Sequence, residues 1–183
     1  MNSTVPNQFP VTDAVKEALA VTLRGCDELI PQDDWVKKLA KSEATGVPLR
    51  IKLGLDPTAP DIHVGHTVVL NKMRQLQNLG HQVIFLIGDF TSLIGDPSGR
   101  NSTRPPLTPE QIKANAETYY RQASLVLDPT KTEIRYNSEW SLPLGAMGMI
   151  QLAAKYTVAR MMERNDFHDR FKAGTPISVH EFL

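Results

Sequence analysis

The stretch Gln82-Val83-Ile84-Phe85-Leu86-Ile87-Gly88 decides the fold of this chain. Its nearly continuous run of apolar residues is typical of a central parallel strand that is covered on both faces. Residues 49–55 alternate between apolar and other residues, which also predicts a strand, and residues 131–137 make a third. Helices are predicted between the strands, over residues 64–79 and 109–127. The alternation of strands and helices predicts an α/β fold with a parallel sheet.

The chain before the first strand has a different character. Thr12 is expected to cap a helix over residues 13–24, and Asp33 a second helix that ends by Gly46. Residues 1–48 are therefore predicted to be an N-terminal helical segment, and residues 49–183 the α/β domain. Within that domain, we expect a polar loop over residues 89–107 and helical structure over 144–174. The last residues look like the opening of another element, so we expect a fragment truncated at its C-terminus.

Composition excludes several classes of protein. The 183 residues are 41% apolar and 22% charged, with a net charge of zero and one cysteine, Cys26. A single cysteine excludes an internally disulfide-stapled scaffold and a cysteine-rich zinc module. No apolar run approaches the ~18 residues of a membrane span, and residues 1–13 lack the pattern of a signal peptide, so a cytoplasmic location is expected. Zero net charge argues against a surface devoted mainly to nucleic acid, although a local basic patch stays open.

Ligand sites in parallel sheets lie at the carboxyl ends of the strands. The residues expected there begin at Asp56, Asp89 and Asn137. The segment after the first strand is the most informative, because His63 and His66 stand where a helix is predicted to begin. A helix N-terminus offers free N–H groups and a partial positive charge, and two imidazoles can donate hydrogen bonds to phosphate oxygens.

These features suit a nucleoside triphosphate, with Gly65 letting a ligand approach the backbone. A chance pair of histidines and a zinc site are the alternatives to this hypothesis. A His-x-x-His pair is frequent by chance, and a zinc site would lack a nearby third ligand. The loop is neither a Walker P-loop nor a dinucleotide fingerprint, since it lacks the glycines that both require.

Three ordered motifs carry a resemblance to a known family. His63-Val64-Gly65-His66 resembles the "HIGH" signature of class I aminoacyl-tRNA synthetases, and the preceding Asp56-Pro57-Thr58-Ala59 is similar to that of the tyrosyl enzymes. Gly95-Asp96-Pro97-Ser98-Gly99-Arg100 and Asn137-Ser138-Glu139-Trp140 resemble two further motifs of the same family. The resemblance runs from about Ala20 to Leu183, and it implies a Rossmann-like catalytic domain.

The family implies a reaction and a set of site residues. Tyrosine attacks the α-phosphate of ATP, which arrives with Mg²⁺, and the tyrosyl group then passes to tRNA(Tyr). The resemblance implies no protein metal site and no bound organic cofactor. For ATP, it assigns Thr58 and His63 to the pyrophosphate oxygens and Gly65 and His66 to the nucleoside. The resemblance also places Pro57 and Val64 near ATP, and Asp56 between the amino acid and the α-phosphate. It assigns Gly54, Thr91, Asp96 and Asn137 to the tyrosine pocket, with Asp96 on the tyrosine ammonium. Arg100 and Arg104 are expected to close on pyrophosphate.

The chain departs from the family pattern in two places. Many bacterial members carry a tyrosine for the substrate phenol where this chain has Lys52, although a second bacterial branch is similar here. The second class I signature, Lys-Met-Ser-Lys-Ser, is absent, and it is expected beyond Leu183 with the tRNA-binding region. The family also implies a homodimer, with residues 144–183 near the interface.

Other readings remain open at this point. The chain could be a tryptophanyl-tRNA synthetase, a nucleotidyltransferase with the same histidine signature, or a non-catalytic nucleotide-binding module. Individual residues also have structural interpretations. Asp96 suits an ordinary turn, Asn137 could satisfy backbone groups, and Lys72 and Arg74 suit the polar face of their helix.

Overall fold

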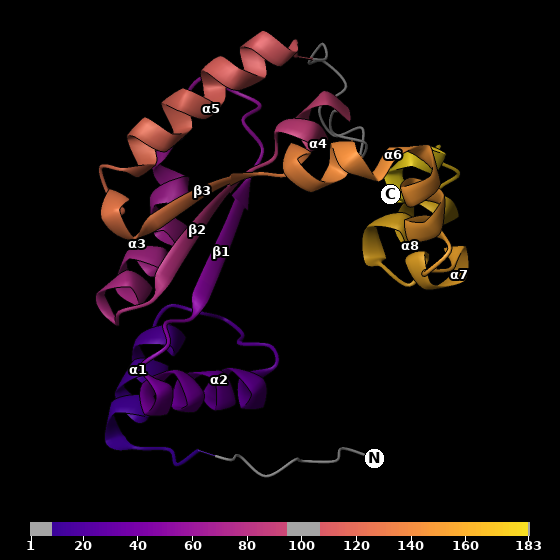
Figure 1. The fold of residues 1–183 in the computed structure, drawn as a ribbon. Helices are drawn as coiled ribbons and strands as arrows, with labels where there is room; N and C mark the ends of the chain where they lie inside the picture. Colours follow the sequence, from indigo (N-terminus) through magenta and orange to yellow (C-terminus); the bar gives the residue numbers. More distant parts are fainter. Residues whose placement is uncertain (1–8, 95–106, 183) are drawn as a thin grey trace. The chain divides into compact units, whose positions relative to one another are not determined.

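The structure, a computed structural model, describes residues 9–94 and 107–182. Three strands form one sheet in the order β1-β2-β3 (Figure 1). They are β1 (Arg50–Leu55), β2 (Gln82–Ile87) and β3 (Thr132–Tyr136). The predicted α/β fold and the central position of the strand at residues 82–88 are confirmed.

The register of the sheet follows from backbone hydrogen bonds. Gln82 N–H donates to Leu49 O (3.0 Å), and Gly88 N–H donates to Leu55 O (2.9 Å), so β1 and β2 advance together as parallel strands. Alternate residues of β2 are fully buried, as an inner strand requires. Asn137 N–H in turn donates to Ile87 O (3.0 Å), which sets the end of β3 beside the end of β2.

The predicted helices are present, the region 144–174 is divided among three of them, and a helix at Asp89–Ile94 is added. They are α1 (Asp13–Leu23), α2 (Gln32–Thr45), α3 (Val64–Asn78), α4 (Asp89–Ile94), α5 (Pro109–Ala123), α6 (Ser138–Ala153), α7 (Val158–Met161) and α8 (Asn165–Lys172), with short 3₁₀ turns η1 (Pro129–Lys131) and η2 (Val179–Phe182). None of these described helices is long and apolar enough to cross a membrane.

Two predictions about these elements were wrong. A polar loop was expected from residue 89, but α4 begins there, where side-chain oxygens of Asp89 and Asn137 both accept from the N–H of Phe90. Asp33 was expected to cap α2, but the helix begins one residue earlier, at Gln32, after Pro31. The other expected caps are confirmed: Thr12 Oγ1 accepts from Val15 N (3.3 Å), and Gly46 ends α2 in the left-handed conformation.

Packing divides the chain into two compact units. The first comprises the described residues of 1–54, 61–86 and 117–134, and the second those of 55–60, 87–116 and 135–183. The predicted domain boundary between residues 48 and 49 stays a prediction.

In the first unit, Val15, Leu39 and Ala40 form a buried cluster of α1 and α2. Lys72 fastens α3 to the end of α1, where its ammonium donates to the carbonyls of Val21 (2.8 Å), Thr22 (3.1 Å) and Arg24 (2.7 Å). A cation at a helix C-terminus is stabilised by the helix dipole. The expectation that Lys72 merely lies on a polar face was therefore wrong.

Gln77 of α3 is completely buried in the same unit. Its carboxamide donates to Asp128 O, Lys131 O and Thr132 Oγ1 (2.8–3.1 Å) and accepts from Asp128 N (2.9 Å). Every polar atom of this side chain is thus paired, which removes the desolvation penalty of its burial. The contact fixes the turn that leads into β3.

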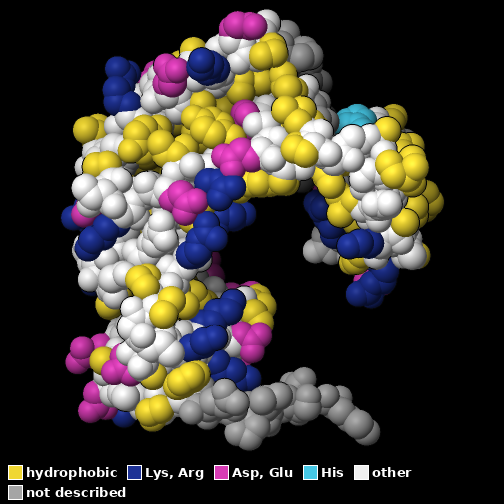
Figure 2. Space-filling view, viewed as in Figure 1, with side chains coloured by type: hydrophobic (Ala, Val, Ile, Leu, Met, Phe, Trp, Pro, Cys, Tyr) yellow, Lys and Arg dark blue, Asp and Glu magenta, His cyan; other side chains and the backbone are white. Residues whose placement is uncertain are grey.

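In the second unit, the helical structure predicted over residues 144–174 is present as α6, α7 and α8, with α6 beginning earlier, at Ser138. Gly145 (φ 60°, ψ −177°) divides α6 into two helical pieces. An ion pair between Arg170 and Glu181, with Nη2 to Oε1 at 3.0 Å, ties α8 to η2. Figure 2 shows hydrophobic side chains gathered over this segment. The exposed large hydrophobic residues of this segment are Trp140, Leu142, Leu144, Met147, Ile150, Leu152, Tyr156, Val158, Phe171 and Val179.

Candidate functional site

Three predicted site residues meet at the carboxyl ends of the strands, within the second unit. Thr91 Oγ1 donates to Asp56 Oδ1 (2.8 Å), and Asn137 Nδ2 donates to Thr91 Oγ1 (3.0 Å). They follow β1, β2 and β3 respectively, so the prediction that these strand ends would come together is confirmed. We call Asp56, Thr91 and Asn137 the strand-end cluster.

The direction of each hydrogen bond in the cluster is fixed by its neighbours. Phe90 N–H, which can only donate, lies 2.8 Å from Asn137 Oδ1, so the amide nitrogen of Asn137 must face Thr91. The Thr91 hydroxyl then accepts from Asn137 and gives its single proton to Asp56. Asn137 makes no side-chain cap on its own helix, α6, and this leaves its carboxamide committed to the cluster.

Gly88 makes room for the cluster. A Cβ at this position would overlap Asp56 Oδ1 and lie 2.6 Å from Thr91 Oγ1. Sequence reasoning placed Gly88 only as the end of a strand. The available signal was its position, because a glycine that directly follows a buried parallel strand stands where backbone and site approach each other closely.

Asp89 was expected at this edge of the sheet, but the sequence assigned neither Asp89 nor Ser138 a role in the site. Asp89 Oδ1 accepts from Ser138 N (3.0 Å), and Asp89 Oδ2 accepts from Ser138 Oγ (2.6 Å). Asp89 Oδ1 also accepts from Phe90 N (2.9 Å). These bonds hold the start of α6 against the start of α4. No sequence signal pairs two residues that lie 49 positions apart.

The two predicted histidines lie together in the first unit, at the start of α3. His63 Nδ1 accepts from Gly65 N (3.1 Å), His66 Nδ1 accepts from His63 N (3.1 Å), and the ring centroids are 4.1 Å apart. Because each ring accepts at Nδ1, the neutral imidazoles carry their proton on Nε2. Both Nε2–H groups are therefore the donors that remain for a ligand.

The position of the His63 ring requires a glycine at residue 65. A Cβ there would lie 2.9 Å from both Cε1 and Nδ1 of His63, so a side chain would push the ring away from its cap. His63, Val64 and Gly65 are exposed, and His66 is half-buried. The helix start thus presents accessible donors, as the anion-site prediction requires.

Two amide side chains of α5 hold the segment between β1 and α3. Within the second unit, Asn115 Nδ2 donates to Pro57 O (3.0 Å). Within the first, Gln122 Oε1 accepts from Ile62 N (2.9 Å), and Gln122 Nε2 donates to Asp61 Oδ1 (2.6 Å). Sequence reasoning missed both amides, although positions 115 and 122 are two turns apart and so share a face of the helix.

The remaining predicted residues are placed as follows. Pro57 is buried, whereas Thr58 and Gly54 are exposed. Asp96, Arg100 and Arg104 lie outside the described residues. Within residues 9–94 and 107–182, no group of three or more His, Cys, Asp or Glu side chains could hold a metal ion.

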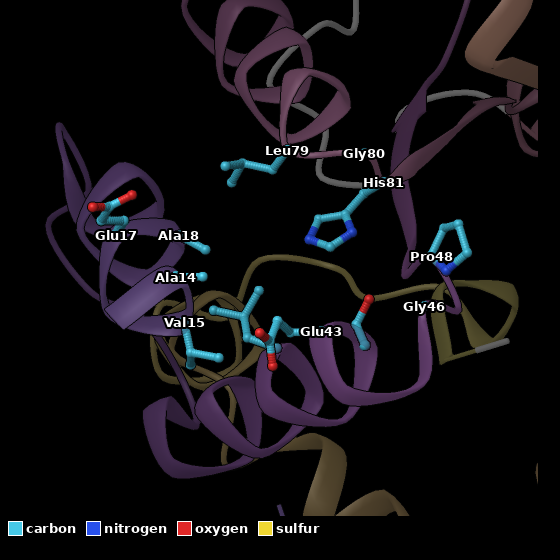
Figure 3. A pocket seen from close by; sticks show the side chains of 12 residues that line it. Ala14, Val15, Glu17, Ala18, Glu43, Gly46, Pro48, Leu79, Gly80 and His81 are labelled. Carbon is cyan, nitrogen blue, oxygen red and sulfur yellow. The ribbon is translucent and has the colours of Figure 1, made fainter. Parts of the chain in front are cut away.

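Two cavities were not anticipated. One of about 400 Å³ lies in the first unit, where the ring of His81 faces side chains of α1 and α2 (Figure 3). Burial lowers the pKa of His81. The other, about 420 Å³, lies in the second unit and is lined by Asp89, Leu93, Pro109, Ile112, Lys113 and Tyr136. Of the residues that line these two cavities, Asp89 is the one that the sequence placed at the ligand edge of the sheet.

The relatives of this chain agree with the motifs. The tyrosine–tRNA ligase of Cupriavidus pinatubonensis is 80% identical over 176 residues, and that of Bordetella pertussis is 76% identical over 176 residues. Each match covers 96% of this chain but only 43% of the relative.

Solved structures share the fold at low identity. A C-terminally truncated mitochondrial tyrosyl-tRNA synthetase of Aspergillus nidulans matches 92% of this chain and 55% of its own, with a TM-score of 0.65 and 21% identity. A tryptophanyl-tRNA synthetase of Plasmodium falciparum matches 85% of this chain and 42% of its own, with a TM-score of 0.54 and 17% identity. These likenesses support the Rossmann-like fold. The sequence profile of class I tRNA synthetases (W and Y) matches residues 44–183, and the chain belongs to this family.

Proposed function

We propose that this chain is the amino-terminal part of a tyrosine–tRNA ligase, which activates tyrosine with ATP and then transfers the tyrosyl group to tRNA(Tyr). The observation that carries the proposal is the similarity to tyrosine–tRNA ligases at 75–82% identity. Since the chain spans about 43% of those relatives, the complete activity belongs to the longer protein. A cytoplasmic location is proposed with it.

The strand-end cluster supports a role in holding tyrosine. Asp56 keeps Oδ2 available while Oδ1 accepts from Thr91, and the Asn137 carboxamide stands beside them. We assign Gly54, Thr91 and Asn137 to the tyrosine pocket, and Asp56 to the junction of the amino acid and the α-phosphate. Asp96 is proposed to bind the tyrosine ammonium through a charge-assisted hydrogen bond.

The histidine pair supports a role in binding ATP, which enters as its magnesium complex. The two Nε2–H groups and the positive end of α3 favour negative charge as it develops on the phosphate oxygens. We assign Thr58 and His63 to the leaving pyrophosphate, and His66 with Gly65 to the nucleoside, with Pro57 and Val64 beside them. Arg100 and Arg104 are proposed to close on pyrophosphate.

The attacking carboxylate of tyrosine is ionised at neutral pH, so the reaction needs no general base to create the nucleophile. These residues therefore act by positioning the substrates and stabilising charge in the transition state. A donor that meets its charge chiefly in the transition state raises the rate without raising ground-state affinity.

A homodimer is proposed for the full-length ligase. The exposed apolar side chains of α6 and α7 form a patch of the kind that marks a protein interface. Covering it with the same patch of a second copy is the arrangement that a two-fold symmetric dimer uses. Sedimentation of the full-length ligase tests this proposal: a monomer would contradict the homodimer, and a dimer that persists when Met147 and Ile150 are changed to aspartate would contradict this interface.

Tyrosine-dependent exchange of pyrophosphate into ATP tests the main proposal. The full-length ligase should catalyse exchange with tyrosine and not with tryptophan, and it should be stabilised against heat by a non-hydrolysable tyrosyl-adenylate analogue. Exchange that depends on tryptophan would instead assign the chain to the other branch of its family. Nucleotide binding without exchange would indicate a non-catalytic module.

The 183-residue chain alone should not charge tRNA, because it spans less than half of its relatives. Acylation of tRNA(Tyr) by the isolated chain is the measurement. Robust charging would show that the proposed division between this chain and the rest of the ligase is wrong.

A further inference from the structure

We propose that Asp89, acting with Ser138, is a positioning residue for the tyrosine site: it fixes Asn137, and through Asn137 it fixes the direction in which Thr91 donates to Asp56. The inference rests on the proposed activation of tyrosine. It adds residues that neither the motifs nor the family resemblance assigns to the site.

Asp89 links α4, which carries Thr91, to the start of α6, which Asn137 directly precedes. Both carboxylate oxygens of Asp89, at the start of α4, accept from Ser138, one from its backbone N–H (3.0 Å) and one from its hydroxyl (2.6 Å). Two bonds to one residue fix both its position and its rotation. Ser138 directly follows Asn137, so Asp89 fixes the backbone from which the Asn137 side chain extends.

The orientation of the Asn137 carboxamide is fixed by the backbone of Phe90. Phe90 N–H lies between two acceptors, Asp89 Oδ1 (2.9 Å) and Asn137 Oδ1 (2.8 Å). Because the Phe90 N–H can only donate, the amide nitrogen of Asn137 cannot face it. Asp89 holds both Phe90 and the backbone next to Asn137 in the positions that this contact needs. The carboxamide therefore presents its nitrogen to Thr91 (3.0 Å).

The Thr91 hydroxyl has a single proton to donate. Two acceptors compete for it, Asp56 Oδ1 at 2.8 Å and Gly88 O at 3.3 Å. With Asn137 donating to the hydroxyl oxygen, the shorter and charge-assisted bond to Asp56 is the favoured one. Asp56 then has one oxygen occupied and one left for the substrate, before any substrate binds.

Asp89 differs from an ordinary turn carboxylate, and the chain supplies a matched control for this difference. Asp128 Oδ1 accepts from the backbone N–H (2.9 Å) and the hydroxyl (2.7 Å) of Thr130, which is the same pair of bonds in a turn that carries no assigned site residue. Replacing Asp128 removes similar chemistry from the fold and leaves the strand-end cluster unaltered.

The experiment compares Asp89→Ala, Asp128→Ala, Asn137→Ala and the double variant Asp89→Ala/Asn137→Ala in the full-length ligase. Tyrosine and ATP dependence of pyrophosphate exchange are measured together with Tm. Asp89→Ala should lower kcat/KM for tyrosine about tenfold, since hydrogen bonds to a charged group are lost, while the KM for ATP changes by less than about twofold. Asp128→Ala should lower Tm and leave both kinetic constants near the wild-type values.

The double variant is the decisive arm. Because Asp89 acts through Asn137, the double variant should lose no more activity than Asn137→Ala alone. Additive losses, or losses for tyrosine and ATP that both follow Tm, would overturn the proposal. If Asp89→Ala does not fold, Ser138→Ala removes only the hydroxyl bond, and its effect should be smaller but equally absent from the Asn137→Ala background.

A crystal structure of Asp89→Ala separates this inference from the proposed function. The amide nitrogen of Asn137 should leave hydrogen-bond distance of Thr91 Oγ1. If it stays near 3.0 Å, the positioning role is wrong. A wild-type protein without tyrosine-dependent exchange would overturn the proposed function, whereas the crystallographic result would still decide the role of Asp89.

Discussion

The strand-end cluster and the histidine pair are built in opposite ways. Asp56, Thr91 and Asn137 come from three strand ends, with bonded partners 35 and 46 positions apart in the sequence. His63 and His66 are three positions apart, and the Nδ1 atom of each ring accepts from a backbone N–H of their own helix start. The cluster therefore depends on the sheet, whereas the pair depends on one turn of helix.

The difference matters for what each group contributes. Side chains held from three directions lose little conformational freedom when a ligand binds, which suits recognition of one amino acid. The histidines use Nδ1 locally and leave Nε2–H free, which suits phosphate oxygens that change charge during the reaction. Under the proposed function, recognition belongs to the strand-end cluster and charge stabilisation to the histidine pair, and substitutions should separate the two.

The largest effect is expected from Gly88→Ala, which acts on the cluster alone. The added Cβ would overlap Asp56 Oδ1 and crowd Thr91 Oγ1, so both groups must move. Displacing two substrate contacts together should lower kcat/KM for tyrosine about 1,000-fold, since small misplacements are costly in preorganised sites. Steady-state pyrophosphate exchange measures this loss, and the affinity for ATP should change far less.

Gly54→Ala provides the comparison for folding. A Cβ on Gly54 would meet only Lys52 Nζ and Leu86 Cδ2, each at an ordinary 3.7 Å, so the Tm of this variant should stay near the wild-type value. If Gly88→Ala binds tyrosine as tightly as wild type, the close approach at Gly88 has no role in the site.

The second effect is expected from His63→Ala, which acts on the pair alone. Loss of one transition-state donor costs about 3 kcal/mol, or about 100-fold in the rate of adenylate formation. Tyrosine affinity should remain close to wild type, because the strand-end cluster is untouched. Single-turnover formation of tyrosyl-adenylate and equilibrium binding of tyrosine are the two measurements.

The same substitution also removes a helix cap, because His63 Nδ1 accepts from Gly65 N. His63→Asn restores a good capping side chain while removing the imidazole Nε2–H. This variant should recover Tm and keep the slow rate. Recovery of the rate together with Tm would show that His63 serves the helix and not the phosphates.

The contrast between the two regions also explains how much the sequence could predict. The run at residues 82–88 identifies an inner strand, and parallel strands place their carboxyl ends at one edge, so the segments that begin at Asp56, Asp89 and Asn137 were predicted to come together. Thr91 was assigned to the site by the family resemblance. The histidines were predictable because a helix start is a local feature.

Side-chain partners across elements were not predictable in the same way. The pairing of Asp89 with Ser138 and the burial of Gln77 against η1 depend on how the elements pack, which no periodicity records. The helix α4 was missed because the N–H of Phe90, in its first turn, donates to Asn137, a residue 47 positions away. Lys72 carries the polar pattern of an exposed face, yet its charge is used at the end of α1.

The smallest effects are expected from truncating the amide side chains of α5, and these variants test whether the strand-end cluster and the histidine pair act independently. Asn115 holds Pro57 O, next to Asp56, whereas Gln122 holds Ile62 N, next to His63. Asn115→Ala removes one neutral hydrogen bond worth about 1 kcal/mol, so the relevant KM should rise about threefold to fivefold, and Gln122→Ala also removes an exposed bond to the Asp61 carboxylate, so its effect should be at least as large. Asn115→Ala should raise the KM for tyrosine, and Gln122→Ala the KM for ATP. Glu117→Ala, an exposed change on the same helix, should alter neither. If both amide variants raise both constants equally, the segment between β1 and α3 moves as one body, and the two regions are less independent than their hydrogen bonds indicate.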